Sequence, residues 1–390
     1  MIKVLLVAPA IAPVIGGAET IAEVLSLGLA SHPDIDLRLL VGNRPSRAVE
    51  NALGDPDRIT VHMDDAVSTD GNVDWERSTF ARAEHLHRLI SHHPVDLIHA
   101  MSHDTAIAAS IAVADLSGSD RPATVATLSE MSTEHSSFGR ARSRFVYGLP
   151  ITGMLHLSRY YRDVAASHGA RVDDHVVTAG VDDRLFLSGN RDDGRRALGA
   201  APDDLVLICP ARYSRRKGQL DLIDALSRLD TGLQRRILLV CAGSTNSASS
   251  DFLAELRAAA AGTQIRIRFE SIGRPDMPDA VAGSDLVVLP SHFEGLGFAA
   301  IEAMIAGRAV VLTDVTGFDE ITSRPDQAVY VPPNDPAALA QAIGAVLSDR
   351  DRRERIALAG HRHAMSQYAS GPFITGVVDY YGSVLGTTGG

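Results

Sequence analysis

Two glutamates around a glycine-rich loop form the segment of the chain best suited to chemistry. Glu294 follows an apolar run, and Glu302 lies further along, with seven residues between the two. The loop contains Gly295, Leu296 and Gly297, and a helix is predicted to begin near Leu296. The free N–H groups and positive dipole end of such a helix can bind an anion such as a diphosphate. The loop carboxylate can accept hydrogen bonds from sugar hydroxyls, and the helix carboxylate from a ribose.

The elements that must position these residues follow a regular order. In the first half of the chain, short runs that are apolar on both faces alternate with helical patterns. Strands are predicted at 4–7, 37–41, 96–100 and 123–128. Runs of this kind are typical of strands buried in a parallel sheet, and alternation with helices predicts a doubly wound α/β fold.

The same order begins again in the second half of the chain. Strands are predicted at 205–210, 237–242, 265–269, 286–290 and 309–312, with helices near 220–229 and 252–261. A cluster of Gly, Asp and Asn at 180–194 marks a boundary between the two sets. We therefore expect an N-terminal domain of residues 1–180 and a C-terminal domain of residues 181–369. The last helix, at about 372–385, is predicted to return to the first domain, which then includes residues 370–390.

Size and composition exclude several classes of protein. A chain of 390 residues exceeds one ordinary core, so two domains are expected. The net charge of −11 and the aromatic content of 5% argue against nucleic-acid binding. Cys209 and Cys241 each end an apolar run and are predicted to be buried thiols in a reducing compartment, such as the cytoplasm. No run of about 18 apolar residues predicts a membrane span. The N-terminal run is broken by Pro9 and Pro13, which favours a strand and loop over a signal peptide.

Several motifs, taken together, resemble the group 1 glycosyltransferases, family 4 in the usual grouping. The glutamate pair lies in EGLGFAAIEAMIAGRAVV, and the segment ARYSRRKG at 211–218 resembles the basic loop of that family. Residues 16–19, GGAE, resemble its N-terminal glycine loop, and residues 179–182, AGVD, its interdomain element. The resemblance implies the GT-B fold, which has two facing Rossmann-like domains with a cleft between them, and retention of anomeric configuration.

The resemblance also implies roles for the cations and carboxylates. Arg212 and Lys217 would neutralise the diphosphate of a nucleotide-sugar donor and stabilise the departing nucleotide. Fixed cations lower a barrier when they lie where charge develops in the transition state. Glu294 would bind hydroxyls of the donor sugar, and Glu302 would bind the ribose. The simpler explanations are surface charges for the two cations and a solvent-exposed helix position for Glu302.

The N-terminal glycines complete the expected donor site. Gly17, with Gly16 beside it, would let the backbone of the first domain approach the phosphates closely, because glycine has no Cβ. The simpler explanation is that both glycines only shape a turn. The expected donor is a nucleotide-diphosphate sugar of the UDP or GDP type. No permanently bound cofactor is expected, and no metal, because two cations take its place.

The acceptor side departs from the family pattern. Many members carry a histidine just after the strand predicted at 123–128, where this sequence has Ser129. His135 lies six residues later and is a candidate to replace it, and Glu130 and His103 are further candidates for acceptor binding. A serine is not a base near neutral pH. The alternative is therefore an acceptor that needs little deprotonation, such as an acidic thiol or an anionic group.

The sequence thus predicts a glycosyltransferase that moves a sugar from a nucleotide-sugar donor to a small soluble acceptor. A composition rich in Ala, Arg and Asp suggests a high-GC bacterium, in which enzymes of this kind often modify small natural products. Two alternatives remain: a nucleotide-sugar 2-epimerase of the same fold, which uses no acceptor, and a catalytically degenerate binding protein. The donor and the acceptor are the expected partners, without nucleic acid or an integral membrane segment, and a homodimer stays open.

Overall fold

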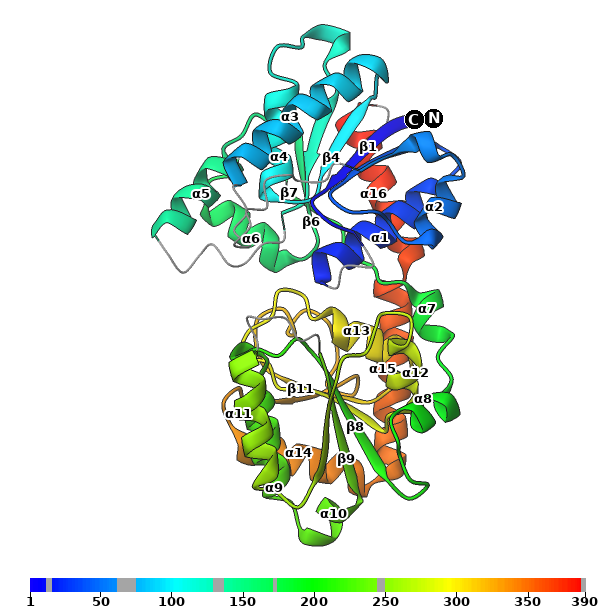
Figure 1. Cartoon of the computed structure of the whole chain (residues 1–390), viewed down its shortest axis with the longest axis vertical. Coiled ribbons are helices and arrows are strands. Elements are labelled where there is room, and N and C mark those ends of the chain that lie inside the picture. Colours follow the sequence, from blue (N-terminus) through cyan, green and yellow to red (C-terminus); the bar gives the residue numbers. More distant parts are fainter. Residues whose placement is uncertain (12–15, 62–74, 129–136, 171–173, 244–249, 387–390) are drawn as a thin grey trace. The chain divides into compact units, whose positions relative to one another are not determined.

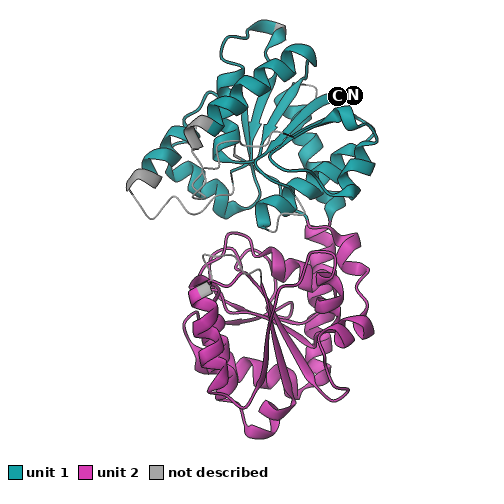
Figure 2. Ribbon diagram, viewed as in Figure 1, with its two compact units in different colours: residues 1–180, 370–390 teal, residues 181–369 magenta. Residues whose placement is uncertain are grey.

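The chain forms two compact α/β units. The computed structural model describes residues 1–11, 16–61, 75–128, 137–170, 174–243 and 250–386 (Figure 1). Unit 1 comprises residues 1–180 and 370–390, and unit 2 comprises residues 181–369 (Figure 2). Each unit is built on one parallel sheet, as the alternation of apolar runs and helical patterns predicts.

Unit 1 contains a seven-stranded sheet in the order β3-β2-β1-β4-β5-β6-β7, with every neighbouring pair parallel. The order reverses between β1 and β4, which is where open α/β sheets bind ligands, beyond the carboxyl ends of the strands. The strands are β1 (Ile2–Ala8), β2 (Ile35–Val41), β3 (Ile59–Val61), β4 (Leu97–Ala100), β5 (Ala123–Ala126), β6 (Gly153–His156) and β7 (Asp174–Val176).

Helices connect these strands. The start of α4 is explained by its sequence, because Ser102 and Thr105 form a reciprocal capping box that satisfies free N–H groups of the first turn. The helices of unit 1 are α1 (Gly17–Ala30), α2 (Arg47–Leu53), α3 (Trp75–His92), α4 (His103–Ala112), α5 (Ser137–Tyr147), α6 (Arg159–Ser167) and α16 (Ser370–Val384).

Helix α16 lies 190 residues beyond the rest of unit 1 in the sequence, yet it packs against that unit. Ile374 contacts Gly28 of α1 so closely that a Cβ at Gly28 would lie 2.3 Å from the Ile374 side chain. Tyr381 of α16 is fully buried and hydrogen bonds to Nδ1 of His99 at 2.6 Å. The C-terminal helix is therefore part of the first unit's core.

His99 is held neutral between three elements. Its Nε2 lies 2.8 Å from the Thr127 hydroxyl, and that hydroxyl donates its own proton to the Leu155 carbonyl. Nε2 must therefore carry the imidazole proton, and Nδ1 accepts from Tyr381. Burial lowers the pKa of His99 to about 3, because a charged imidazolium loses its hydration there.

Unit 2 contains a six-stranded parallel sheet in the order β10-β9-β8-β11-β12-β13. Its order reverses between β8 and β11. The strands are β8 (Leu205–Pro210), β9 (Ile237–Ala242), β10 (Arg266–Glu270), β11 (Leu286–Leu289), β12 (Val310–Thr313) and β13 (Val329–Val331). The helices are α7 (Asp183–Leu187), α8 (Arg191–Ala197), α9 (Gln219–Ser227), α10 (Thr231–Arg236), α11 (Ser250–Ala261), α12 (Met277–Gly283), α13 (Phe298–Ile305), α14 (Pro336–Ser348) and α15 (Arg350–Tyr368).

The strands predicted from apolar runs are all present, within about two residues at each end. Four short strands, β3, β6, β7 and β13, have no counterpart among those predictions. Cys209 on β8 and Cys241 on β9 are buried, unbonded neighbours in register, as expected of structural thiols. The helix predicted to begin near Leu296 begins two residues later, at Phe298.

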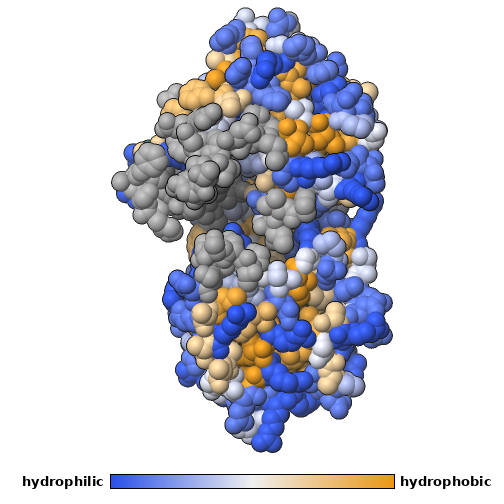
Figure 3. Space-filling model, viewed as in Figure 1, coloured by the Kyte–Doolittle hydropathy of each residue, from blue (hydrophilic) through white to orange (hydrophobic). Residues whose placement is uncertain are grey.

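Polar residues cover most of the face seen in Figure 3, and apolar residues show between them on both units. Among the residues that the structure describes, no helix has the length and hydropathy needed to cross a lipid bilayer.

The state of His99 predicts how unit 1 responds to acid. Below about pH 6.5 the unfolded chain binds a proton at this histidine and the folded chain does not, so stability falls as the pH falls towards 3. The contribution is about 1.4 kcal/mol per pH unit within that window. Urea unfolding at a series of pH values, followed by far-ultraviolet circular dichroism, measures this dependence. The His99→Gln variant should show a shallower pH dependence, and equal slopes would contradict a neutral His99.

Candidate functional site

The basic loop and the glutamate loop of unit 2 follow the two strands at which the sheet order reverses. Residues 211–218 follow β8, and residues 290–297 follow β11. Strands β8 and β11 are hydrogen-bonded neighbours, with Leu286 in register with Leu207. Because both strands are parallel, their carboxyl ends lie at the same edge. The two loops therefore meet where ligands bind in this class of sheet.

The two loops approach each other closely because glycine occupies the end of the basic loop. Gly218 has a φ of 64°, and a Cβ there would lie 1.9 Å from the Pro290 carbonyl oxygen. Only glycine fits this position without displacing the second loop. Two further hydrogen bonds join the loops: His292 N–H donates to the Arg216 carbonyl at 2.8 Å, and the Arg216 guanidinium donates to the Phe293 carbonyl at 3.3 Å.

An ion pair completes this connection. Lys217 Nζ donates to Oε1 of Glu294 at 2.5 Å, and the Ser291 hydroxyl donates to the same oxygen at 2.6 Å. The side chains of Lys217 and Glu294 are only 15% and 9% exposed. Among the described residues, Oε2 of Glu294 has no hydrogen-bond donor. The carboxylate is thus fixed through one oxygen, with the other left as an acceptor.

Arg212 differs from the other cations of its loop. It is exposed, and its guanidinium forms no hydrogen bond or ion pair with any residue that the structure describes. In contrast, the Arg215 guanidinium pairs with Glu255 and lies over the ring of Phe252. Lys217 therefore supplies positive charge at Glu294, and Arg212 adds an exposed cation on the same loop, whereas Arg215 pairs with Glu255 of α11.

Backbone geometry holds the glycine loop against a neighbouring turn. Gly297 has a φ of 71° and precedes α13, and its missing Cβ leaves room for the ring of Phe318. Gly317 has a φ of 88°, and a Cβ there would lie 2.6 Å from the Glu294 carbonyl oxygen. No side chain caps the N-terminus of α13 in the described structure. The first N–H groups of this helix can therefore serve an anion.

Glu302 lies on α13 and is also held by one cation. Arg274 Nη1 donates to its Oε1 at 3.1 Å, and the two side chains are 16% and 13% exposed. Burial raises the pKa of the Glu302 carboxyl, the nearby Arg274 opposes that rise, and the carboxylate of Asp182 adds to it.

In unit 1, the two N-terminal glycines lie at the start of α1. Gly16 is the N-cap residue, in extended conformation with a φ of 177°, and Gly17 is the first residue of the helix. A Cβ at Gly16 would lie 2.1 Å from a carboxylate oxygen of Glu19. Both glycines follow β1, one of the two strands at which the sheet order of unit 1 reverses.

The acceptor candidates are only partly placed. His103 begins α4 after β4, is 1% exposed and lies edge-on to the ring of Tyr147. Its role towards an acceptor stays a prediction. Ser129, Glu130 and His135 lie outside the residues that the structure describes.

Sequence reasoning missed two partners of the predicted site residues and one further contact of the glutamate loop. Ser291 shares Oε1 of Glu294 with Lys217, Arg274 holds Glu302, and Asp221 of α9 accepts a hydrogen bond from His292 Nε2 at 2.6 Å. The contact of Ser291 could have been predicted, because Ser291 lies only three residues before Glu294. The other two join residues 28 and 71 positions apart, and no periodicity connects them.

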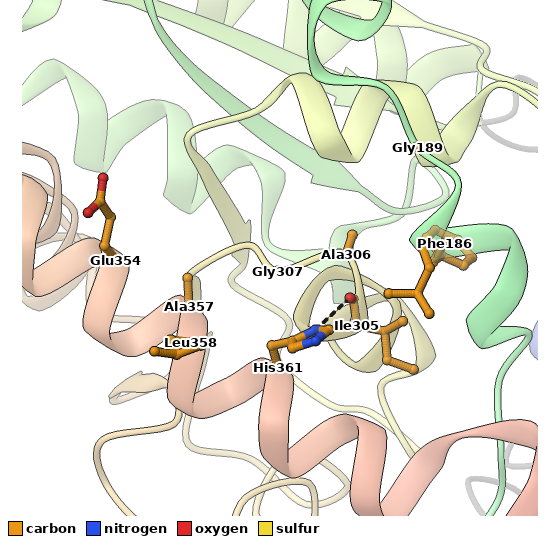
Figure 4. A pocket seen from close by; sticks show the side chains of 10 residues that line it. Phe186, Gly189, Ile305, Ala306, Gly307, Glu354, Ala357, Leu358 and His361 are labelled. Atoms are coloured by element: carbon orange, nitrogen blue, oxygen red, sulfur yellow. Dashed lines mark hydrogen bonds between the residues drawn. The ribbon is translucent and has the colours of Figure 1, made fainter.

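A cavity of unit 2 lies at the opposite end of α13 from the glycine loop. It measures about 350 Å³ and is lined by α7, α15 and the C-terminal end of α13. In Figure 4 the ring of Phe186 lies beside Ile305, whose carbonyl accepts a hydrogen bond from His361 Nδ1 at 2.8 Å. In the described part of the chain, no three His, Cys, Asp or Glu side chains are grouped as metal ligands would be.

Part of this chain is similar in sequence to named proteins. Residues 190–363 match the model of the family described as glycosyl transferases group 1. A D-inositol 3-phosphate glycosyltransferase of Catenulispora acidiphila is 32% identical over 49% of this chain and 47% of its own. One from Nocardia farcinica is 33% identical over 52% of this chain and 46% of its own. The chain therefore spans about half the length of the curated relatives that it matches.

Solved structures resemble nearly the whole chain in fold. The Anabaena protein HepE, in complex with UDP and glucose, has a TM-score of 0.79 and 20% identity, with coverage of 98% of this chain and 100% of its own. Sucrose-phosphate synthase of Thermosynechococcus elongatus has a TM-score of 0.81 and 16% identity, with coverage of 99% and 100%. Residues 190–363 are thus similar to the group 1 glycosyl transferases, and the chain as a whole has the GT-B fold of two parallel-sheet α/β units.

Proposed function

We propose that this chain is a glycosyltransferase that moves a sugar from a nucleotide-diphosphate donor to a small acceptor, with unit 2 binding the donor. The observation that carries the proposal is the pairing of Lys217 with Glu294 across the point at which the sheet order reverses. It brings a phosphate-binding cation and a sugar-binding carboxylate into contact. The match of residues 190–363 to the group 1 glycosyl transferases supports the same reaction class.

The cations act on the leaving group. As the bond between the sugar and the diphosphate breaks, negative charge grows on the phosphate oxygens. Lys217, which is held by Glu294, and the N-terminal N–H groups of α13 supply positive charge that is already oriented before the reaction begins, and Arg212 adds a further cation from the same loop. Such preorganised charge stabilises the transition state more than the ground state.

The carboxylates bind the rest of the donor. Glu294 presents Oε2 to a sugar hydroxyl while Lys217 and Ser291 keep Oε1 fixed. Glu302 accepts a hydrogen bond from the ribose. With Gly295, Leu296 and Gly297 the backbone comes close to the sugar. The roles of Gly16 and Gly17 towards the phosphates stay predictions.

The choice of donor and acceptor rests on similarity. UDP is the nucleotide in the solved HepE complexes, which favours a UDP-sugar over a GDP-sugar here. The matching curated relatives carry the name D-inositol 3-phosphate glycosyltransferase, which favours a small polyhydroxylated or phosphorylated acceptor bound by unit 1. We further propose retention of anomeric configuration, a role in natural-product biosynthesis and a cytoplasmic location, the last supported by two unbonded cysteines.

Thermal shift and turnover test the proposal directly. UDP should raise the melting temperature of the chain, because a ligand that binds only the folded state stabilises it by mass action. GDP, ADP and dTDP provide the comparison. Release of UDP from a UDP-sugar should require an acceptor. Formation of an epimerised sugar without any acceptor would instead identify a 2-epimerase, and binding without any turnover would identify a degenerate transferase.

Removing the cations should slow the chemical step. We expect Arg212→Ala to lower kcat by roughly 10²-fold to 10³-fold, the usual cost of one oriented donor at a developing charge. Lys217→Met should have an effect of similar size, although it also removes the partner of Glu294. Arg215→Ala is the matched control, because its guanidinium pairs with Glu255 instead. Arg212→Ala protein with unchanged melting temperature and unchanged kcat would show that phosphate binding has been assigned to the wrong residue.

Charge compensation by Arg212 and Lys217 predicts that turnover needs no metal. Activity measured after treatment with EDTA and removal of the chelator should equal that of untreated protein. Loss of activity that Mg²⁺ or Mn²⁺ restores would place part of the diphosphate charge on a metal and reduce the role given to the two side chains.

A further inference from the structure

Arg274 lies in the segment between β10 and α12 and contacts the carboxylate that the proposed function gives to the ribose. Its Nη1 donates to Oε1 of Glu302 at 3.1 Å. Both side chains are largely buried, so the geometry of this pair is much better defined than that of an exposed ion pair. Among the described residues, nothing donates to Oε2 of Glu302.

An aromatic ring supports the arginine. The guanidinium carbon of Arg274 lies 5.8 Å from the ring centroid of Phe186, within the range of cation–π contacts. Phe186 belongs to α7, is 2% exposed and forms part of the wall of the 350 Å³ cavity (Figure 4). The guanidinium is therefore held between a carboxylate and a buried ring, and it has little freedom to turn.

The cation favours the charged form of Glu302 against two effects that oppose it. Its carboxyl is buried, and the carboxylate of Asp182, which caps α7, raises its pKa further. Arg274 opposes both effects and lowers the pKa of the carboxyl, and its hydrogen bond fixes Oε1. A carboxylate that is fixed through one oxygen presents its other oxygen in a defined orientation as an acceptor for a ribose hydroxyl.

We propose that Arg274 is a positioning residue that makes the nucleotide site select ribose over 2′-deoxyribose. It binds Oε1 of Glu302 and so keeps Oε2 available as an oriented acceptor for a ribose hydroxyl. The inference rests on the proposed function, which gives Glu302 to the ribose. Arg274 contacts neither the sugar nor the diphosphate in this scheme, and its effect is on affinity and specificity.

Calorimetric binding of UDP and 2′-deoxy-UDP to the full chain tests the inference. A hydrogen bond to a charged acceptor is worth an affinity for UDP about 10-fold or more higher than the affinity for 2′-deoxy-UDP in the unmodified protein. Arg274→Met should weaken UDP binding by about 10-fold and leave 2′-deoxy-UDP binding nearly unchanged, so that the preference disappears. Arg274→Lys should restore part of it. In steady-state assays, Arg274→Met should raise KM for the donor and leave kcat nearly unchanged.

Two further variants show whether a lost preference for UDP comes from the contact between Arg274 and Glu302. Arg268→Met removes a guanidinium of the same region that pairs with Glu270, and it should keep the full preference. Glu302→Gln should lose the preference just as Arg274→Met does. A folded Arg274→Met protein that keeps the ratio, or an unmodified protein without any preference, would overturn the inference and leave the proposed function standing. Unmodified protein that binds neither UDP nor GDP would overturn the proposed function itself.

Discussion

The ion pair between Lys217 and Glu294 is the interaction on which the rest of the site depends. It joins two loops that are 77 residues apart in sequence and that follow neighbouring strands. Both side chains are largely buried, so the loss of either would leave the other as an uncompensated charge, which typically costs about 3–5 kcal/mol. The pair therefore holds both loops in place and orients the groups proposed to bind the donor.

The pair can form only because the backbones of the two loops come unusually close. Gly218 faces the Pro290 carbonyl and Gly317 faces the Glu294 carbonyl, each at a distance that a Cβ would not allow. Both glycines also have positive φ, a conformation that is strained for other residues. Gly218 and Gly317 must therefore be glycine for two reasons, the positive φ and the lack of room for a Cβ.

The two units stabilise their buried ionisable groups in different ways. In unit 2, the carboxylates of Glu294 and Glu302 remain paired with cations, and one oxygen of each has no partner among the described residues. In unit 1, His99 is kept neutral, with Thr127 and Tyr381 satisfying both ring nitrogens. The first arrangement suits binding of a polar ligand, whereas the second joins α16 to the sheet and contributes to stability.

The sequence by itself determined the class of fold and the strands with long apolar runs, because these depend on local patterns, and the glutamate and lysine positions of the proposed site came from a family resemblance. It did not reveal β3, β6, β7 and β13, since three or four residues carry too little pattern to identify a strand. Only the tertiary structure decided that Lys217 and Ser291 share one oxygen of Glu294, and that Arg274 reaches Glu302 across 28 residues. Such contacts depend on how loops from separate strands meet at a sheet edge, and that geometry arises only when the whole sheet has formed.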